Sequence, residues 1–378
     1  MGILIGADFV PTKSNEEWFE KGKVKELVGE ELYKKIIQAD YRIFNLEAPL
    51  TNSFQPIKKC GPNLIAHTNT INAYKKLGVN LFTLANNHIL DQGISGVIST
   101  QNILESVGIN YVGLKSNKFL DNSSFIFSYG GKKVGVYACT EHEFSTLNNI
   151  FDIIANPYDE KIIYEKIKVL KEKCDYIIVL YHGGKEYYRY PSPKLQESCR
   201  KMISFGANLV VCQHSHCIGC EEKYENGTIV YGQGNFLFDL SNNEYSQTGL
   251  LIELDSNFKI SYIPLKKNGN SISIASKSEA LEIISAFNFR SKEIQEKDFI
   301  INNYNKFTEE MFETYLWTLS GKESIVFKIL NKLTNGKLRA WSLRKKYNDE
   351  AIMKIYNYII CEAHNELLTN ILERKIYE

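Results

Sequence analysis

Polar residues that are common in metal centres follow five apolar segments of this sequence. These clusters are Gly6-Ala7-Asp8, Asn45-Leu46-Glu47, Asn86-Asn87-His88 with Asp91, His182-Gly183-Gly184-Lys185-Glu186, and Gln213-His214-Ser215-His216. Each apolar segment has the length and composition of a buried β-strand, and α/β sheets place their sites at the carboxyl ends of strands. If these strands belong to one sheet, two carboxylates, one amide oxygen and three histidines converge on one edge.

Each cluster on its own also fits an ordinary structural role. Asp8 is typical of a helix cap, Asn86-Asn87 of a turn, and His182 of a hydrogen-bonded histidine at a strand end. A purely structural explanation of the whole set would need six separate coincidences. The set therefore favours a metal centre.

The donor atoms indicate two divalent metal ions. Carboxylate and amide oxygens are hard ligands and imidazole nitrogens are borderline, so the set suits Mn, Fe or Zn better than a site that demands thiolates. Two-metal sites turn water into a nucleophile near neutral pH. Glu47 is the expected bridge between the ions, and the i, i+2 spacing of His214 and His216 lets one imidazole reach each ion.

The elements that must position these residues are those of an α/β domain. From residue 1 to about 265, short β-branched or apolar runs alternate with helical periodicity. Three predicted helices, 69–77, 94–107 and 193–205, are each followed by a glycine that can take the left-handed conformation at a helix end. The predicted strands are 2–7, 41–45, 80–84, 110–113, 124–128, 133–138, 175–181, 208–212, 228–231, 248–254 and 258–264.

The composition is that of a core-forming protein of about two domains. The chain has 378 residues, 44% of them hydrophobic, and its 45 basic and 44 acidic residues give a net charge of +1. The balanced charge gives no overall signature of nucleic-acid binding, and no apolar run approaches the roughly 18 to 20 residues that span a membrane. Eight scattered cysteines and an N-terminus without a signal-peptide pattern predict a reduced, cytoplasmic protein.

Beyond about residue 270 the sequence predicts a helical appendage, 270–378, after a domain over 1–265. Within it, residues 321–346 contain eight basic residues and one acid, Glu323: Lys322, Lys328, Lys332, Lys337, Arg339, Arg344, Lys345 and Lys346. Two interpretations stay open. One is a solvated helical face. The other is a peripheral patch that docks on anionic lipid at the inner face of the membrane, on a polyanionic substrate or on a capsule-synthesis complex, with Trp317, Phe327 and Trp341 as interfacial anchors.

Five ordered motifs make the first 265 residues resemble the bacterial CapA family of capsule and poly-γ-glutamate synthesis, within the calcineurin-like metallophosphoesterase superfamily. The motifs are Asn45-Leu46-Glu47-Ala48-Pro49-Leu50-Thr51, Leu84-Ala85-Asn86-Asn87-His88-Ile89-Leu90-Asp91-Gln92-Gly93, His182-Gly183-Gly184-Lys185-Glu186-Tyr187, Gln213-His214-Ser215-His216 and Gly232-Gln233-Gly234-Asn235-Phe236-Leu237-Phe238-Asp239. The resemblance implies a four-layer α/β/β/α sandwich with a metal centre at the strand ends.

The resemblance also implies a role for individual residues. Asp8 and His216 would serve one ion, Asn87, His182 and His214 the other, and Glu47 would bridge them. His88 would act as a general acid held by Asp91. The residues expected near the substrate are Asn45, Asn86, Lys59, Lys185, Glu186 and Asn235.

Three features depart from the wider phosphoesterase pattern. Asp8 is followed by Phe9-Val10 rather than by the Asp-Xaa-His histidine, so one ion keeps only Asp8, Glu47 and His216 from the protein. Gln213 stands where the Gly-His-Xaa-His motif has glycine. Many relatives carry an N-terminal signal or anchor, and none is evident here. Separately, Cys217-Ile218-Gly219-Cys220 fits either two unlinked thiols or a zinc or redox site.

These observations predict a metal-dependent phosphomonoesterase or phosphodiesterase that acts on a phosphorylated or polymeric cell-envelope substrate. Two alternatives stay open. The metals would serve amide-bond or transfer chemistry on a poly-γ-glutamate or capsule precursor, or the chain would be a non-catalytic scaffold of a polymer-synthesis complex. Metal analysis separates the enzymes from the scaffold.

Overall fold

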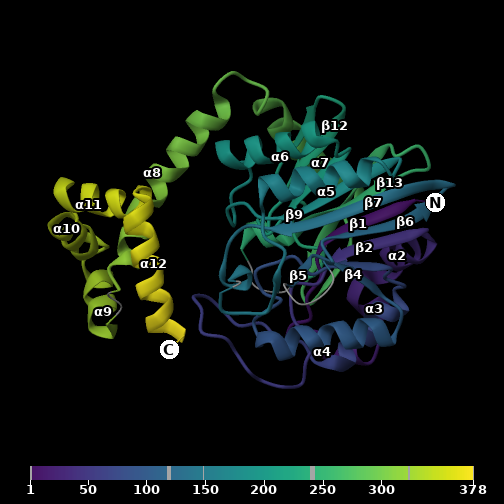
Figure 1. Cartoon of the computed structure of the whole chain (residues 1–378), viewed down its shortest axis with the longest axis horizontal. Helices are drawn as coiled ribbons and strands as arrows, with labels where there is room; N and C mark the ends of the chain where they lie inside the picture. Colours follow the sequence, from purple (N-terminus) through teal and green to yellow (C-terminus); the bar gives the residue numbers. More distant parts are fainter. Residues whose placement is uncertain (1, 117–120, 148, 239–242, 322–323, 378) are drawn as a thin grey trace. The chain divides into compact units, whose positions relative to one another are not determined.

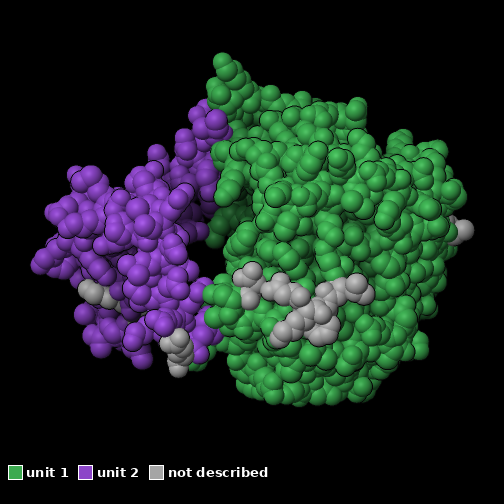
Figure 2. Space-filling view, in the orientation of Figure 1, with its two compact units in different colours: residues 1–300 green, residues 301–378 purple. Residues whose placement is uncertain are grey.

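The chain forms two compact units, residues 1–300 and residues 301–378 (Figure 2). A computed structural model describes residues 2–116, 121–147, 149–238, 243–321 and 324–377. Three residues named above, Asp239, Lys322 and Glu323, lie outside the described residues. The change of sequence texture near residue 270 coincides with the last strand, whereas the first compact unit continues to residue 300. The domain limits 1–265 and 270–378 stay a prediction.

The first sheet of residues 1–300 has seven strands in the order β15-β14-β13-β1-β2-β3-β4. Strands β1 to β4 run parallel, and β13, β14 and β15 extend the sheet with antiparallel pairing. The strands are β1 (Ile3–Asp8), β2 (Tyr41–Asn45), β3 (Leu81–Thr83), β4 (Asn110–Val112), β13 (Thr248–Leu254), β14 (Ile260–Asn268) and β15 (Ser271–Ile274).

The second sheet has six strands in the order β11-β12-β10-β9-β7-β6, with β12, β10, β9 and β7 parallel. Its edge strands β11 and β6 are antiparallel to their neighbours. The strands are β6 (Ser124–Tyr129), β7 (Lys132–Thr140), β9 (Tyr176–His182), β10 (Leu209–Gln213), β11 (Glu221–Tyr224) and β12 (Gly227–Tyr231). A separate two-stranded sheet pairs β5 (Leu114–Ser116) with β8 (Ile153–Ala155).

The two sheets pack face to face between outer layers of helices (Figure 1). Alternation along β1 shows how the sequence builds this: Ile3 and Ile5 enter the core between the sheets, whereas Leu4 joins the core under the helices. The helices of this unit are α1 (Glu16–Glu20), α2 (Val24–Gln38), α3 (Ile71–Lys76), α4 (Gly93–Ser106), α5 (Glu160–Lys171), α6 (Pro193–Phe205) and α7 (Lys277–Glu293). The predicted α/β/β/α sandwich is confirmed.

Residues 301–378 form a helical unit, as the sequence predicted for the C-terminal region. The helices are α8 (Phe299–Leu319), which begins at the end of the first unit, α9 (Ile325–Leu333), α10 (Lys337–Lys346), α11 (Asp349–Ile360) and α12 (Glu362–Tyr377). Among the described residues, no helix combines the length and apolar character that crossing a membrane requires.

All eleven predicted strands occur, with limits that differ by a few residues at most. The predicted helices correspond to α3 with the preceding 3₁₀ turn Thr68–Thr70, to α4 and to α6, and Gly78, Gly108 and Gly206 all have positive φ. Four short strands were not predicted: β5, β8, β11 and β15. They lie at sheet edges or outside the two main sheets, and with three or four residues each they are too short for a period-two pattern to be recognised.

Candidate metal centre

The candidate metal centre lies where the carboxyl ends of strands from both main sheets meet. In the first sheet, Asp8 at the end of β1 pairs with Asn45 at the end of β2; in the second, His182 at the end of β9 pairs with Gln213 at the end of β10. The strand ends therefore come from two sheets, as the α/β/β/α sandwich requires, and not from one. The shared core between the sheets brings the two sets of strand ends together.

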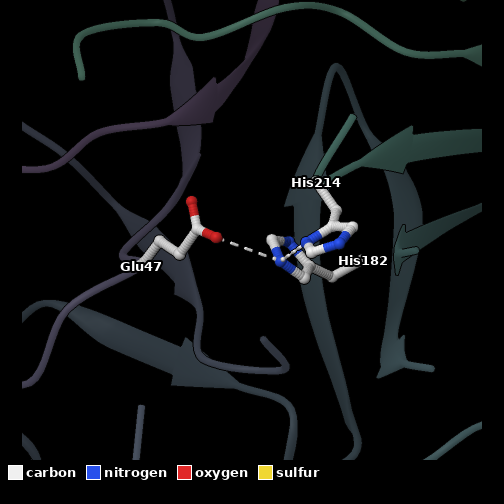
Figure 3. Close-up of side chains that lie close together, drawn as sticks. All are labelled: Glu47, His182 and His214. Atoms are coloured by element: carbon white, nitrogen blue, oxygen red, sulfur yellow. Dashed lines mark hydrogen bonds and ion pairs between the residues drawn. The ribbon is translucent and has the colours of Figure 1, made fainter. Parts of the chain in front are cut away.

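Three polar groups converge on one nitrogen of His182. Its Nε2 atom lies 3.0 Å from Asn87 Oδ1, 3.1 Å from His214 Nδ1 and 3.2 Å from Glu47 Oε1. Figure 3 shows the Glu47 carboxylate facing the imidazoles of His182 and His214. Glu47, His182 and His214 are buried, and one ligand atom from each lies within 4.8 Å of the others. We call Glu47, Asn87, His182 and His214 the His182 subsite.

A second group shares Glu47. The ligand atoms of Asp8, Glu47 and His216 also lie within 4.8 Å of one another, and all three residues are buried. His216 Nδ1 is 3.4 Å from Asp8 Oδ2 and 2.8 Å from Asn235 Oδ1. We call Asp8, Glu47 and His216 the Asp8 subsite. Val10, at the position of the missing histidine, is buried in the core under the helices.

The carboxylates of both subsites suit divalent cations. The side chains of Asp8 and Glu47 are 0% exposed. Asp8 Oδ2 and both Glu47 oxygens lack a hydrogen-bond donor among the described residues. The contact of Glu47 Oε1 with His182 Nε2, at 3.2 Å, is an ion-pair contact. A buried carboxylate is costly unless a cation or hydrogen-bond donors compensate its charge. Two ions flanking Glu47 would provide that compensation, so the residues present fit the predicted pair of metals.

The charges of the cluster shift the pKa values of its members in opposite directions. Burial disfavours the charged form of His216, but Asp8 and Glu47 outweigh it and raise the pKa of His216 to about 10. For His182, burial likewise opposes protonation, and Glu47 and Asp8 still raise its pKa. Burial together with the neighbouring imidazoles holds the pKa of His214 well below its usual range, so His214 is the neutral imidazole of the set.

Two buried asparagines connect the strand ends. Asn45 Nδ2 donates to Asp8 Oδ1 at 2.7 Å and lies 3.2 Å from His182 Nδ1, while Asn45 Oδ1 accepts from Asn86 Nδ2 at 3.0 Å. Asn86 also donates to the Leu46 carbonyl and accepts from the His88 amide. The structure thus places Asn45 and Asn86, which the sequence assigned to the substrate, where they orient the ligands.

His88, Asp91 and Lys59 form a separate buried group beside the His182 subsite. His88 Nδ1 lies 2.6 Å from Asp91 Oδ2, and the Lys59 ammonium is paired with Asp91 Oδ1 and 3.2 Å from His88 Nδ1. The Lys59 side chain is only 4% exposed. Lys59, predicted to contact substrate, therefore has its charge directed at Asp91. The Asp91 and Lys59 contacts are both made by Nδ1 of His88, on the opposite side of the ring from Nε2.

The remaining predicted residues lie at differing depths. Asn235 is buried beside His216, and its Nδ2 atom has no hydrogen-bond partner among the described residues. Lys185 and Glu186 are exposed in the loop after β9.

Cys217 and Cys220 are buried free thiols, and neither belongs to a cluster of potential metal ligands among the described residues. Burial raises the pKa of Cys217 to about 11. Two unlinked thiols is the interpretation that agrees with this structure.

The backbone after β10 directs the two histidines to different partners, His214 to His182 and His216 to Asp8. His214 and His216 have φ of 88° and 52°, in the left-handed region that few residues with a side chain adopt. Such conformations persist where surrounding structure holds them, often at functional sites. The i, i+2 spacing alone did not reveal this backbone conformation. With it, His214 contacts His182 and His216 contacts Asp8.

Sequence reasoning missed Glu141, which directly follows β7. Its Oε1 lies 3.5 Å from His214 Nε2, and its Oε2 accepts from the Gly184 amide at 3.1 Å. Burial raises the pKa of Glu141. Glu141 faces the imidazole nitrogen opposite the one near His182, so it favours a proton on Nε2 and a free Nδ1. Glu141 is a polar residue directly after an apolar strand, as the five clusters are, so the same sequence pattern could have identified it.

Comparisons with known proteins agree with the sequence motifs. Residues 8–240 match the family model of the bacterial capsule synthesis protein PGA_cap. The chain is 29% identical over 213 residues to the capsule biosynthesis protein CapA of Bacillus anthracis and 26% identical over 209 residues to the PGA biosynthesis protein CapA of Bacillus subtilis (strain 168). Each match covers 53% of this chain and 51% or 54% of the relative. The chain thus spans about half the length of the curated relatives it matches.

Two solved structures show more distant similarity. A phosphatase from Mycoplasma pneumoniae is 17% identical, with 71% of this chain and 94% of that chain covered and a TM-score of 0.45. The NAD nucleotidase NadN of Haemophilus influenzae is 15% identical, with 82% and 68% covered and a TM-score of 0.40.

Proposed function

Because the chain belongs to the family of the bacterial capsule synthesis protein PGA_cap, we propose that it is a metal-dependent hydrolase that cleaves a phosphate ester during synthesis of a capsule or another surface polymer. The observation that carries the proposal is the pair of buried ligand groups that share Glu47. All their members lie within the matched residues 8–240. The names of the CapA relatives support the polymer context.

In the proposed reaction, some residues of the centre would bind the metal ions and others would orient those ligands. Asp8 and His216 would hold one divalent ion, Asn87, His182 and His214 the other, and Glu47 would contact both. When bound, two such ions polarise a phosphoryl oxygen and make water nucleophilic near neutral pH. Asn45 and Asn86 fix the directions of Asp8 and His182 through hydrogen bonds. Holding the ligands before substrate arrives avoids reorganisation during the reaction.

His88 is the proposed general acid for the leaving group. Its contact with Asp91 at 2.6 Å fixes the ring and leaves Nε2 to deliver the proton. Lys59 balances the buried charge of Asp91, so the pair is held without a further cation. In this role His88 acts on the substrate, whereas Asp91 and Lys59 are positioning residues.

The test uses the full chain, stripped of metal with a chelator and reloaded with Mn²⁺. We expect about two equivalents of metal per chain and hydrolysis of p-nitrophenyl phosphate or bis-p-nitrophenyl phosphate. His214→Ala should lower both the metal content and the rate. His364→Ala is the matched control, because His364 is exposed and lies in residues 301–378.

Three outcomes would argue against the proposal in different ways. Failure to bind metal would favour the scaffold. Metal binding without phosphoester hydrolysis, together with activity on a poly-γ-glutamate precursor, would favour amide or transfer chemistry. Equal hydrolysis by wild type and His214→Ala would assign the activity to a contaminant or to another site.

The polymeric or phosphorylated envelope substrate is part of the same proposal. The predicted contact of residues 321–346 with a membrane or a capsule-synthesis complex is a separate matter, since the family model ends at residue 240.

A further inference from the structure

The short helix α9 carries an exposed apolar stripe. Ile325, Val326, Ile329, Leu330 and Leu333 follow the spacing i, i+1, i+4, i+5, i+8 and therefore share one face of the helix. All five are exposed, Ile325 and Leu333 by 77% and 76%. Single exposed apolar residues are ordinary, whereas a contiguous set marks an interaction surface.

The opposite face of α9 is fixed to its neighbours. Phe327 stacks on Trp317 of α8, with 4.7 Å between ring centroids. Asn331 Oδ1 accepts a hydrogen bond from the Arg339 amide of α10 at 3.0 Å. Phe327 and Trp317, which the sequence suggested as interfacial anchors, thus hold the helices together. Their contact determines which face of α9 remains outward within this unit.

The sequence from the start of α9 to the end of α10 carries only basic charge. From residue 324 to residue 347 the sequence has seven Lys and Arg residues and no Asp or Glu. On α9, Lys328 and Lys332 fall on the helical face next to the apolar stripe. A groove of about 430 Å³ adjoins them, with Trp317, Phe327 and Arg339 in its lining. A basic border along an apolar stripe is the pattern of a helix that lies in a membrane interface.

Helices α11 and α12 provide an internal contrast. They also expose apolar side chains, including Met353 and Leu367. Their residues 349–377 contain five acidic and three basic side chains, however. The negative surface of an anionic bilayer attracts basic segments and does not favour a surface with excess acid. Charge therefore distinguishes α9 from the other exposed apolar surface of the unit.

We propose that α9 and the basic residues around it bind the surface of a bilayer that contains anionic lipids. The five apolar side chains enter the interface, and Lys328, Lys332 and Lys337 contact lipid phosphates. The helix lies along the surface: its nine residues, at about 1.5 Å per residue, are far too short to span it. This inference does not depend on the metal centre, and it would bring a hydrolase of residues 1–300 to the envelope.

The experiment measures binding of the full chain to vesicles, with no substrate or added metal. Vesicles of phosphatidylcholine and phosphatidylglycerol in equal parts are compared with vesicles of phosphatidylcholine alone by sedimentation. We expect binding only to the anionic vesicles, weakened by salt. A basic residue at such a surface contributes about a fivefold factor in affinity, so K328Q/K332Q/K337Q should weaken binding by about 100-fold. I325S/L333S should also weaken it.

Matched controls remove equal charge or equal apolar area elsewhere in the unit. K354Q/R374Q/K375Q and M353S/L367S should bind as wild type does, and circular dichroism melting should show that all four variants stay folded. Equal binding to both vesicle types, or equal losses in test and control variants, would overturn the proposal. So would a dimer that I325S/L333S dissociates or a protein partner that it releases, since either would assign the stripe to protein contacts.

Discussion

The two halves of the candidate metal centre share Glu47 but differ in their ligands. The His182 subsite has two imidazoles, a carboxylate and an amide, with three groups within 3.2 Å of His182 Nε2. The Asp8 subsite has two carboxylates and one imidazole, and His216 lies 3.4 Å from Asp8. Imidazoles favour transition metals such as Zn²⁺ and Fe²⁺, whereas an oxygen-rich set suits harder ions such as Mn²⁺.

The sequence predicts this difference at one position. Val10, where the resemblance to phosphoesterases predicts a histidine, contributes its side chain to the core under the helices. The Asp8 subsite therefore depends on Glu47 and His216, whose Nδ1 atom lies 2.8 Å from the Asn235 amide oxygen. We expect the His182 subsite to fill first and the Asp8 subsite to bind more weakly.

The largest effect should come from the residue that both subsites share. Glu47→Gln keeps the side-chain volume but removes the shared negative charge, so metal content should fall at both subsites. Loss of even an indirect metal contact costs about 10- to 100-fold in affinity or activity, so the rate should fall by more than about 100-fold. Metal analysis and phosphoester hydrolysis measure these changes.

Stability provides the control for this variant. Neither Glu47 oxygen accepts a hydrogen bond from the described residues, and relief of its buried charge offsets loss of its His182 contact, so the metal-free variant should melt close to metal-free wild type. A lower melting temperature would mean that Glu47 supports the fold, and retention of two equivalents of metal would contradict its bridging position.

A smaller effect should separate the subsites. His216→Ala removes a ligand only from the Asp8 subsite and should retain one equivalent of metal with wild-type affinity. His182→Ala removes the nitrogen around which the His182 subsite is organised, so its first equivalent should bind at least about tenfold more weakly. Calorimetric titration with Mn²⁺ of the two variants in parallel measures this. Equal affinities would show that the subsites do not differ as their ligands suggest.

The fold could be predicted because its signal is repetitive. Along β1, Ile3 and Ile5 pack in the core between the sheets, and Leu4 packs in the core under the helices. Glycines such as Gly206 mark where helices end. Edge strands such as β11, which reads Glu221-Glu222-Lys223-Tyr224, bury little apolar area and left no such pattern. The α/β/β/α layers were implied by a family resemblance, and the two cores now explain them physically.

The site could be predicted only as a set of residue types. The sequence predicted candidate ligands from the residues at strand ends, but the distances between them depend on how two sheets pack, which no local pattern records. Lys59 illustrates the limit: a lysine in a predicted loop looked available to substrate, and the fold directs it to Asp91. The left-handed backbone at His214 and His216 is likewise set by tertiary contacts and not by residue preference.

The smallest predicted effect concerns Glu141, which acts only on the His182 subsite. Its carboxylate faces His214 Nε2 at 3.5 Å, so it should keep the proton on that nitrogen and leave Nδ1 to the metal. Glu141→Ala should weaken the first Mn²⁺ equivalent by about 10-fold, because a partner outside the ligand shell typically contributes about 10- to 100-fold. The weaker second equivalent should be unchanged.

Glu141→Gln tests whether residue 141 acts by orienting the His214 imidazole or by supporting the surrounding loop. The amide oxygen of Gln can still accept a hydrogen bond from the Nε2–H group of His214. This variant should therefore recover part of the metal affinity that Glu141→Ala loses. Glu165→Ala, on the exposed face of α5, is the control for loss of a surface carboxylate. If Glu141→Ala weakened both equivalents alike, Glu141 would act on the whole centre through the loop held by its Gly184 hydrogen bond, and the asymmetry of the two subsites would need another cause.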